Sequence, residues 1–315
     1  MNTTTNERVR CLIIGSGPAG YTAAIYATRA NLSPVLYEGM QPGGQLTITS
    51  HVENFPGHPD PIMGIQLMDN LRQQASRLGA DLRAGIATGA DLSQAPYRVI
   101  INESLTMEAD TLIIATGASA KYLGLPDEQK YAGSGVSACA TCDGFFYRKK
   151  VVAVVGGGDT ACEEAIYLAS LASKVYMIVR KNRLRASMVM QDRVFHNPRI
   201  EILFEHNTVG LFGEHALEGA RLVKRQGMPD AEEVSIAVDG FFLAIGHTPN
   251  SGIFREWLAT DEAGYIITEA DSPRTCLPGV FAAGDVADSR YRQAITAAAS
   301  GCKAAIEADR YLLSV

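Results

Sequence analysis

The sequence repeats one pattern twice, an apolar strand followed by a glycine-rich turn and a helix, and this repeat limits the fold more than any other feature. The first copy is the strand at residues 10–14 and the turn at 15–20; the second is the strand at 151–155 and the turn at 156–161. An alanine-rich helical stretch follows each turn. Such a turn lets the backbone approach a pyrophosphate, so the sequence predicts two nucleotide-binding units.

Each copy ends on a second apolar strand that runs into a glycine, at residues 110–117 and 239–246. The residues after 246 are too few for another domain of this type, and they contain a further strand and a final helix. We therefore predict an α/β fold of two Rossmann-like, three-layer ββα-type nucleotide-binding domains, the second inserted in the first. The first domain is residues 1–117 and 246–315, and the second is residues 118–245.

Composition excludes several classes of partner. The net charge is −6, with 28 Lys and Arg against 34 Asp and Glu, which argues against nucleic acid because phosphate contacts need clustered basic residues. No apolar run approaches the roughly 20 residues of a membrane helix, and the N-terminus lacks the pattern of a signal peptide. Six cysteines without an export signal favour reduced thiols, so a cytoplasmic protein is expected.

Cys139 and Cys142 form a Cys-x-x-Cys pair shortly before the second strand–turn–helix copy. A pair of this kind beside a βαβ unit predicts a redox dithiol. The alternative is a coincidental pair of cysteines in a loop. Asp143 and the aromatic residues beyond it make this alternative the weaker interpretation. A zinc ribbon would need two such pairs, so no metal is expected. The other cysteines, which look structural, are Cys11, Cys162, Cys276 and Cys302.

The residues after the two turns predict different nucleotides. Glu38 lies where the dinucleotide fingerprint places an acid that accepts hydrogen bonds from a ribose hydroxyl. Arg180 lies at the corresponding place in the second copy, with Lys181 and Arg185 nearby. A guanidinium there attracts the 2′-phosphate of NADP(H), although a solvated basic loop is the alternative. The first turn prefers a different nucleotide, and FAD is the candidate.

These motifs occur in an order that resembles bacterial-type, low-molecular-weight thioredoxin reductases, in the FAD/NAD(P)-dependent pyridine nucleotide-disulfide oxidoreductase family. The resemblance covers nearly the whole chain and rests on CATCDG at 139–144, the two turns, GGQL at 43–46, VENFPG at 52–57, GD at 284–285 and RQA at 292–294. It implies an NADPH-dependent thioredoxin-disulfide reductase that binds FAD tightly, forms a homodimer and has thioredoxin as its protein substrate.

The resemblance also implies residue roles. Cys142 would exchange electrons with the flavin, Cys139 would attack the thioredoxin disulfide, and Asp143 would donate and accept the proton. For FAD it implies Gly15, Ser16, Gly17, Pro18, Ala19, Gly20, Glu38, Gly39, Gly43, Gly44, Gln45, Asn54, Gly284, Asp285, Arg292, Gln293 and Ala294. For NADPH it implies Gly156, Gly158, Asp159, Thr160, Ala161, Arg180, Lys181 and Arg185.

The sequence departs from the family pattern at one place, and two other functions are compatible with parts of it. The family commonly carries His-Arg-Arg after the last strand of the second unit, where this chain has Val-Arg-Lys at 179–181. A second enzymatic hypothesis is a flavin reductase that serves ferredoxin. It is disfavoured because that chemistry needs no dithiol, and because the family that takes electrons from ferredoxin has lost the second fingerprint. A flavoprotein redox sensor that docks a partner without turnover is a third. The relatives that serve peroxiredoxin carry an N-terminal thioredoxin-like extension, and no such extension is expected here.

Overall fold

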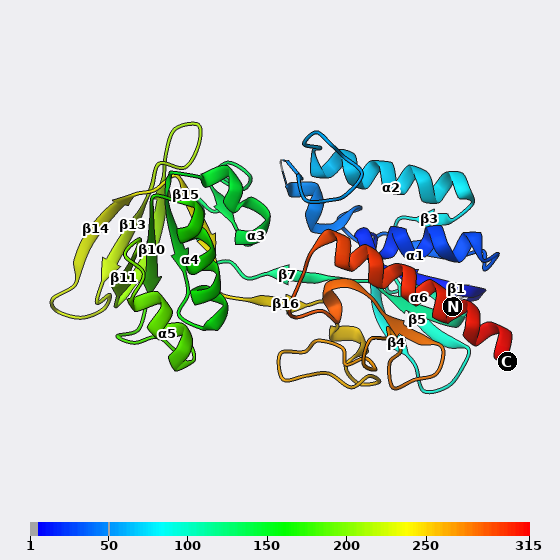
Figure 1. Cartoon of the computed structure of the whole chain (residues 1–315). Coiled ribbons are helices and arrows are strands. Elements are labelled where there is room, and N and C mark those ends of the chain that lie inside the picture. The colour runs from blue at the N-terminus through cyan, green and yellow to red at the C-terminus, as the bar shows by residue number, and fades with distance from the viewer. Residues whose placement is uncertain (1–5, 50) are drawn as a thin grey trace. The chain divides into compact units, whose positions relative to one another are not determined.

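The computed structural model describes residues 6–49 and 51–315, and the chain divides into two compact units (Figure 1). One unit is Met1–Ser119 with Thr248–Val315, and the other is Ala120–His247. The first unit is therefore discontinuous in sequence. These limits lie two residues further along the chain than those that the sequence predicts for the two domains.

The first unit is built on a seven-stranded sheet with the order β3-β2-β1-β6-β5-β4, in which β17 also pairs with β6. Its parallel part places the ends of β1 and β6 side by side, with Ile14 opposite Ile114. The glycine turn therefore begins at the carboxyl edge of the sheet, where α/β folds bind ligands. The strands are β1 (Asn6–Ile14), β2 (Val35–Tyr37), β3 (Asp81–Arg83), β4 (Ala87–Asp91), β5 (Tyr97–Ile101), β6 (Leu105–Ile114) and β17 (Val280–Ala282).

Three long helices, α1 (Pro18–Arg29), α2 (Gly64–Leu78) and α6 (Ala294–Ser314), belong to this unit. Pro18 suits the first turn of α1, because its missing N–H is not needed there. The buried side of α1 is mostly alanine, which lets α6 approach closely. A Cβ on Gly301 of α6 would lie 2.1 Å from the carbonyl oxygen of Ala19, so this helix contact requires glycine.

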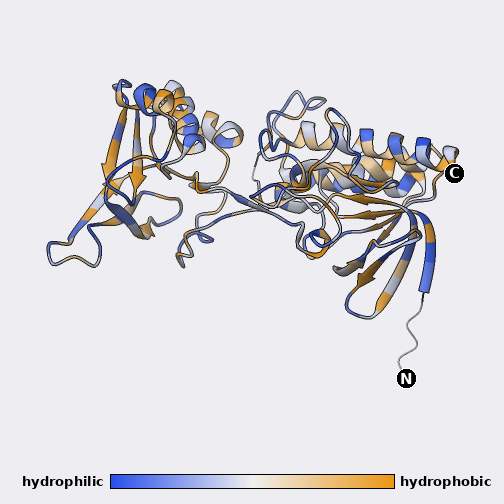
Figure 2. Cartoon of the chain, turned by 90° about the horizontal axis from the view of Figure 1, so that it is seen from below, coloured by the Kyte–Doolittle hydropathy of each residue, from blue (hydrophilic) through white to orange (hydrophobic). Residues whose placement is uncertain are grey.

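The second unit has a five-stranded parallel sheet, a three-stranded antiparallel sheet and helices α4 (Asp159–Leu171) and α5 (Met188–Phe195). One hydrophobic cluster joins the helices to the parallel sheet, and another joins that sheet to the antiparallel one. Figure 2 shows the apolar colour concentrated on strands and both colours on the helices. The strands are β8 (Val136–Ser137), β9 (Val151–Val155), β10 (Lys174–Val179), β11 (Ile200–Phe204), β15 (Gly240–Leu243), and antiparallel β12 (His206–Phe212), β13 (Gly219–Lys224) and β14 (Glu232–Ala237).

The repeat found in the sequence is reproduced in the backbone hydrogen bonds. Gly15 N donates to Tyr37 O at 2.9 Å, and in the second unit Gly156 N donates to Ile178 O at 3.2 Å. Both turns are thus tied to the end of the next parallel strand. The predicted α/β fold with two Rossmann-like units is confirmed.

The chain passes between the units through two short strands, β7 (Ala118–Ala120) and β16 (His247–Pro249), which pair with each other. The remaining short elements are α3 (Ala140–Asp143), η1 (Gly44–Ile48), η2 (Gly144–Tyr147), η3 (Gly252–Phe254) and η4 (Gly284–Val286). Among the residues that the structure describes, no helix has both the length and the apolar character needed to cross a membrane.

Candidate redox and nucleotide-binding sites

The two cysteines of the Cys-x-x-Cys pair are joined in a disulfide in the second unit. Strand β8 ends at Ser137, Cys139 caps the short helix α3, and Cys142 lies within that helix. The Cys142 N–H points at the Cys139 sulfur, with an N–S distance of 3.3 Å. The dithiol thus follows the carboxyl end of a parallel strand, β8, just as the glycine turn of the same unit follows the carboxyl end of β9.

Asp143 lies directly after the pair, and two opposing effects act on its carboxyl group. Burial raises the pKa of Asp143, while a side-chain hydrogen bond with Ser137 lowers it, and the net shift is upward. The Ser137 hydroxyl also accepts a hydrogen bond from Cys139 N at 3.0 Å. Ser137 therefore contacts both the proposed acid and the backbone of one cysteine. Sequence patterns do not identify Ser137, because a serine two residues before a cysteine matches no motif.

The first glycine turn is shaped to leave room for a ligand. A Cβ on Gly15 would lie 2.2 Å from Ala115 O, and one on Gly20 would lie 1.9 Å from Gly15 O. A Cβ on Gly17 would meet nothing within 4 Å. The outer glycines thus allow tight packing, whereas the middle one faces open space, as the pyrophosphate of a dinucleotide requires. The residues of this turn fit FAD.

Further predicted FAD residues are brought to the same turn. The Ser16 hydroxyl donates to Glu38 O at 2.7 Å and accepts a hydrogen bond from Gly43 N at 3.0 Å. Gly43 and Gly44 have φ angles of 91° and 67°, which glycine adopts readily. One hydroxyl therefore links the glycine turn, the acid after β2 and the Gly43–Gly44 loop. The Gln45 side chain donates to Ala118 O, and Gly39 N donates to Gly85 O at 3.0 Å.

The predicted C-terminal residues lie around the start of α6. Asn54 Nδ2 donates to Gln293 Oε1 at 3.4 Å, so residues far apart in sequence are brought together. Gln293 caps α6 with a capping box. Burial raises the pKa of Asp285 to about 6; Asp288 adds to the shift and Arg292 opposes it. Asp285 is half-buried, and a carboxyl group of this kind beside a helix start is a suitable partner for ligand hydroxyl groups.

The second turn repeats the geometry of the first. A Cβ on Gly156 would lie 2.5 Å from Ala244 O, whereas one on Gly158 would meet nothing within 4 Å. Ala161 takes the place of the third glycine and is fully buried. This turn fits a second dinucleotide.

The basic loop after β10, residues 180–187, is hydrogen-bonded to the second turn. Gly157 O accepts hydrogen bonds from Arg185 N at 2.6 Å and from Ala186 N at 3.2 Å. Asp159 Oδ1 accepts two more from the backbone and hydroxyl of Ser187, at 3.0 and 2.7 Å. The loop carries four exposed cations that have no ion-pair partner among residues 6–49 and 51–315, namely Arg180, Lys181, Arg183 and Arg185. Of these four, Arg183 is the one that the sequence motifs do not predict.

Comparison with known proteins decides the family. The sequence model described as pyridine nucleotide-disulphide oxidoreductase matches residues 9–301. The chain belongs to this family. Within it, a thioredoxin reductase of Rickettsia felis is 46% identical over 303 residues, covering 96% of this chain and 98% of the relative. Thioredoxin reductase 1 of Saccharomyces cerevisiae is 48% identical over 313 residues, covering 96% and 98%.

Solved structures of this family agree with the sequence matches. The chain is similar to a thioredoxin reductase from Giardia duodenalis, with a TM-score of 0.92, 41% identity and coverage of 98% of this chain and 99% of that one. It is also similar to a thioredoxin reductase from Streptococcus pyogenes, with a TM-score of 0.93, 38% identity and coverage of 99% and 100%. The family predicted from the motifs is confirmed.

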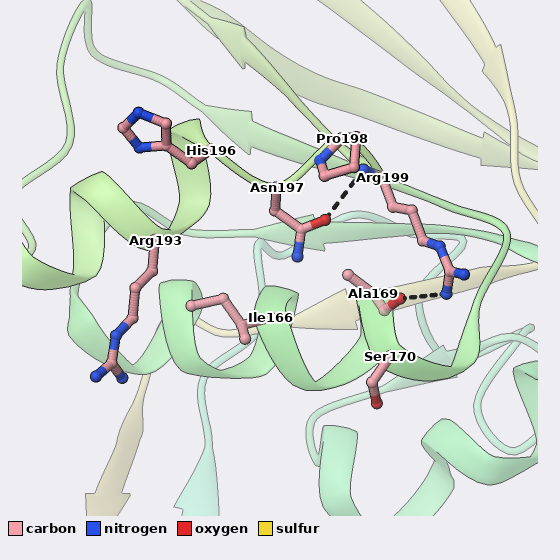
Figure 3. A pocket seen from close by; sticks show the side chains of 8 residues that line it. All are labelled: Ile166, Ala169, Ser170, Arg193, His196, Asn197, Pro198 and Arg199. Carbon is pink, nitrogen blue, oxygen red and sulfur yellow. Dashed lines mark hydrogen bonds between the residues drawn. The ribbon is translucent and has the colours of Figure 1, made fainter.

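A surface pocket of this oxidoreductase lies apart from the predicted nucleotide residues (Figure 3). Its volume is about 520 Å³. Arg199 spans it, donating through Nη1 to Ala169 O at 2.9 Å and through its backbone N–H to Asn197 Oδ1 at 3.0 Å. The first bond ties the end of α4 to the segment before β11, and the second lies within that segment. The lining residues are Ile166, Ala169, Ser170, Arg193, His196, Asn197, Pro198 and Arg199.

The four other cysteines of this family member are free thiols. Burial raises the pKa of Cys11 to about 12 and that of Cys162 to about 11, so neither forms the reactive thiolate readily. Cys276 is exposed and Cys302 half-buried. Within the described parts of the chain, no group of three or more His, Cys, Asp or Glu side chains is placed to hold a metal ion.

Proposed function

We propose that this chain is an NADPH-dependent thioredoxin-disulfide reductase. The observation that carries the proposal is the Cys139–Cys142 disulfide, which shares a unit with a dinucleotide turn in a family member whose full-length relatives are named thioredoxin reductase. We assign FAD to the first unit and NADPH to the second. When bound at the first turn, FAD would supply the two-electron chemistry that links NADPH to the disulfide.

The chain's own residues carry the later steps. Two electrons and two protons convert the disulfide to two thiols, and Cys142 would be the sulfur that receives the electrons from the flavin. Cys139 then gives up its proton and attacks one sulfur of oxidised thioredoxin, forming a mixed disulfide and releasing the other sulfur as a thiolate that takes up a proton. Cys142 gives up its proton and attacks Cys139, which restores the disulfide and releases the second thioredoxin sulfur, and protonation of that sulfur completes dithiol thioredoxin.

Asp143 is the proposed proton donor and acceptor for this exchange. Its raised pKa keeps more of the carboxyl protonated near neutral pH than an ordinary aspartic acid. It can therefore protonate a departing thiolate and take the proton back when the dithiol is oxidised. No histidine adjoins the pair in sequence to compete for this role.

The basic loop supports NADPH as the electron donor. Arg180, Lys181 and Arg185 are exposed beside a turn that fits a pyrophosphate, so they are available to a 2′-phosphate. We further propose that the protein acts as a homodimer in the cytoplasm; the family resemblance supports the homodimer, and the four free cysteines support the cytoplasm.

The test is an assay of the FAD-loaded protein with NADPH and oxidised thioredoxin. We expect steady NADPH consumption, and we expect Cys139→Ser and Cys142→Ser to abolish it while flavin reduction by NADPH continues. Cys276→Ser, which removes an exposed thiol of the first unit, is the matched control and should retain full turnover. Turnover by either dithiol variant would contradict the proposal.

The same assay separates the two other functions. A flavin reductase serving ferredoxin would reduce its acceptor without the dithiol, so both serine variants would remain active toward it. A redox sensor would bind its partner but consume no more than one equivalent of NADPH.

A further inference from the structure

The carboxylate of Glu38 is buried and held by two side chains that no motif identified. Glu38 directly follows β2 and is only 5% exposed. The Tyr21 hydroxyl donates to its Oε1 at 2.7 Å. Arg72 donates through Nε to the same oxygen at 2.6 Å and through Nη2 to Oε2 at 3.3 Å. Tyr21 comes from the first turns of α1 and Arg72 from α2, so three elements meet at one carboxyl group.

These contacts leave one hydrogen-bond acceptor position of the carboxylate unoccupied. An ionised carboxylate has about four acceptor positions, two on each oxygen. Tyr21 and Arg72 together occupy two positions on Oε1 and one on Oε2. The remaining position on Oε2 can accept a hydrogen bond from a ligand, and its direction is fixed because the other three are engaged.

We propose that Tyr21 and Arg72 are positioning residues that hold Glu38 so that its Oε2 accepts a hydrogen bond from the adenosine ribose of FAD. This inference rests on the proposed function, which assigns FAD to the first unit. It adds two residues to the recognition of the cofactor, neither of which belongs to the glycine fingerprint.

The charge balance of the cluster favours this role. An unpaired buried carboxylate is costly, and beside the glycine turn it would also repel the pyrophosphate of a dinucleotide. Arg72 neutralises it, and the Arg72 side chain is 45% exposed, so its guanidinium keeps much of its hydration. The hydrogen bond with Glu38 raises the pKa of Arg72, which keeps it charged.

Tyr21 supplies a donor that does not change with pH in the neutral range. Burial raises the pKa of Tyr21, and the hydrogen bond to Glu38 adds to the shift. The hydroxyl therefore keeps its proton and continues to donate it to Oε1. Since Tyr21 is 1% exposed, water cannot easily replace this donor.

The test measures FAD binding by the full-length chain after its flavin has been removed, without NADPH or thioredoxin. Two ligands are titrated by flavin fluorescence: FAD and an analogue that lacks the 2′-hydroxyl of the adenosine ribose. The unsubstituted protein should bind the analogue about tenfold more weakly, which is the range for one hydrogen bond to a charged group.

The variants are Tyr21→Phe, which removes one donor, and Arg72→Gln, which removes the charge. Each should weaken FAD about three- to tenfold and reduce the preference over the analogue to less than about threefold. Arg72→Lys should recover part of the FAD affinity and part of the preference over the analogue, because lysine keeps the charge but loses the bidentate hydrogen bonding of the guanidinium. The matched controls are Tyr26→Phe and Arg77→Gln, which lie on the same two helices without contacts to Glu38. They should change neither the FAD affinity nor the preference over the analogue.

The preference is a ratio measured on one preparation, so a fraction of misfolded variant does not alter it. A variant that binds FAD more weakly with undiminished preference would mean that the two residues support only the fold, and the inference would be wrong. Unchanged affinity would also contradict it. FAD binding by the unsubstituted protein without any preference would overturn this inference alone, whereas no FAD binding would overturn the proposed function with it.

Discussion

At the scale of single residues, the pKa of Asp143 is set by burial and by its contact with Ser137, not by its place in a motif. The sequence identifies Asp143 because it follows Cys142, but nothing in the sequence says that its carboxyl group is partly buried or that Ser137 contacts it. The same holds for Tyr21 and Arg72 around Glu38. Spacing rules find residues that touch a ligand, whereas side chains that orient those residues come from other elements and follow no spacing.

A pH profile tests the pair Asp143 and Ser137. If protonated Asp143 donates the proton in thioredoxin reduction, the rate should fall as pH rises through its raised pKa. Ser137→Ala removes the bond that lowers this pKa, so the fall should move to higher pH. Asp143→Asn should slow the exchange by about 10²–10⁴-fold, the usual range for an acid or base, and leave flavin reduction by NADPH intact.

Stopped-flow measurements with thioredoxin between pH 5 and 9 would provide these profiles. Ser170→Ala, on the exposed side of α4 in the same unit, is the control and should leave the profile unshifted. A shift of the Ser137→Ala profile to lower pH would contradict the assigned roles.

At the scale of elements, the strands and turns of the repeat were predicted closely because their signal is local. Strand β9 begins and ends at the residues that the sequence predicts, 151–155, whereas β1 ends at the predicted Ile14 but begins at Asn6, before the predicted residue 10. The antiparallel sheet β12–β13–β14 was expected only as a layer of the fold, without bounds. Its strand β14 has the burial pattern of an edge with few buried residues, so its hydrophobic alternation is weak. Helix α2 and its residue Arg72 were likewise not predicted.

The middle glycines of the two turns allow a reciprocal test. Gly17 has φ −66° and ψ −176°, and Gly158 has φ −95° and ψ −179°, which alanine also adopts. Since a Cβ at either position meets open space, Gly17→Ala and Gly158→Ala should fold. Gly17→Ala should weaken FAD by about tenfold or more, and Gly158→Ala should raise the KM for NADPH similarly, because the methyl group fills the space of the pyrophosphate.

Each of these variants is the control for the other, since each should affect one nucleotide only. Gly20→Ala should instead destabilise the protein by roughly 1–3 kcal/mol or more, because its Cβ would overlap Gly15 O. Titration of flavin, NADPH kinetics and chemical denaturation would measure the three effects. Normal affinities in both alanine variants would mean that the turns do not hold the pyrophosphates.

At the scale of the whole molecule, the chain consists of two units with separate hydrophobic clusters. Two clusters belong to residues of the first unit and two to residues of the second. The sequence could predict this arrangement because the repeat marks where the second unit starts and ends. Only two chain segments, β7 and β16, connect the units covalently, so each unit should respond to its own ligand.

Hydrogen exchange tests this independence. A ligand stabilises the folded form that binds it by about 2.7 kcal/mol at a hundredfold excess over its Kd. FAD added to the flavin-free protein should therefore slow exchange in Met1–Ser119 and Thr248–Val315, and NADP⁺ should slow it in Ala120–His247. The buried strands β1 and β9, one from each unit, report global opening and are the segments to compare. Gly17→Ala and Gly158→Ala serve as controls, since each should remove the protection given by one nucleotide only. Equal slowing of β1 and β9 by either nucleotide would mean that the two units open as one cooperative structure, and the assignment of one nucleotide to each unit would then need direct evidence from the variants.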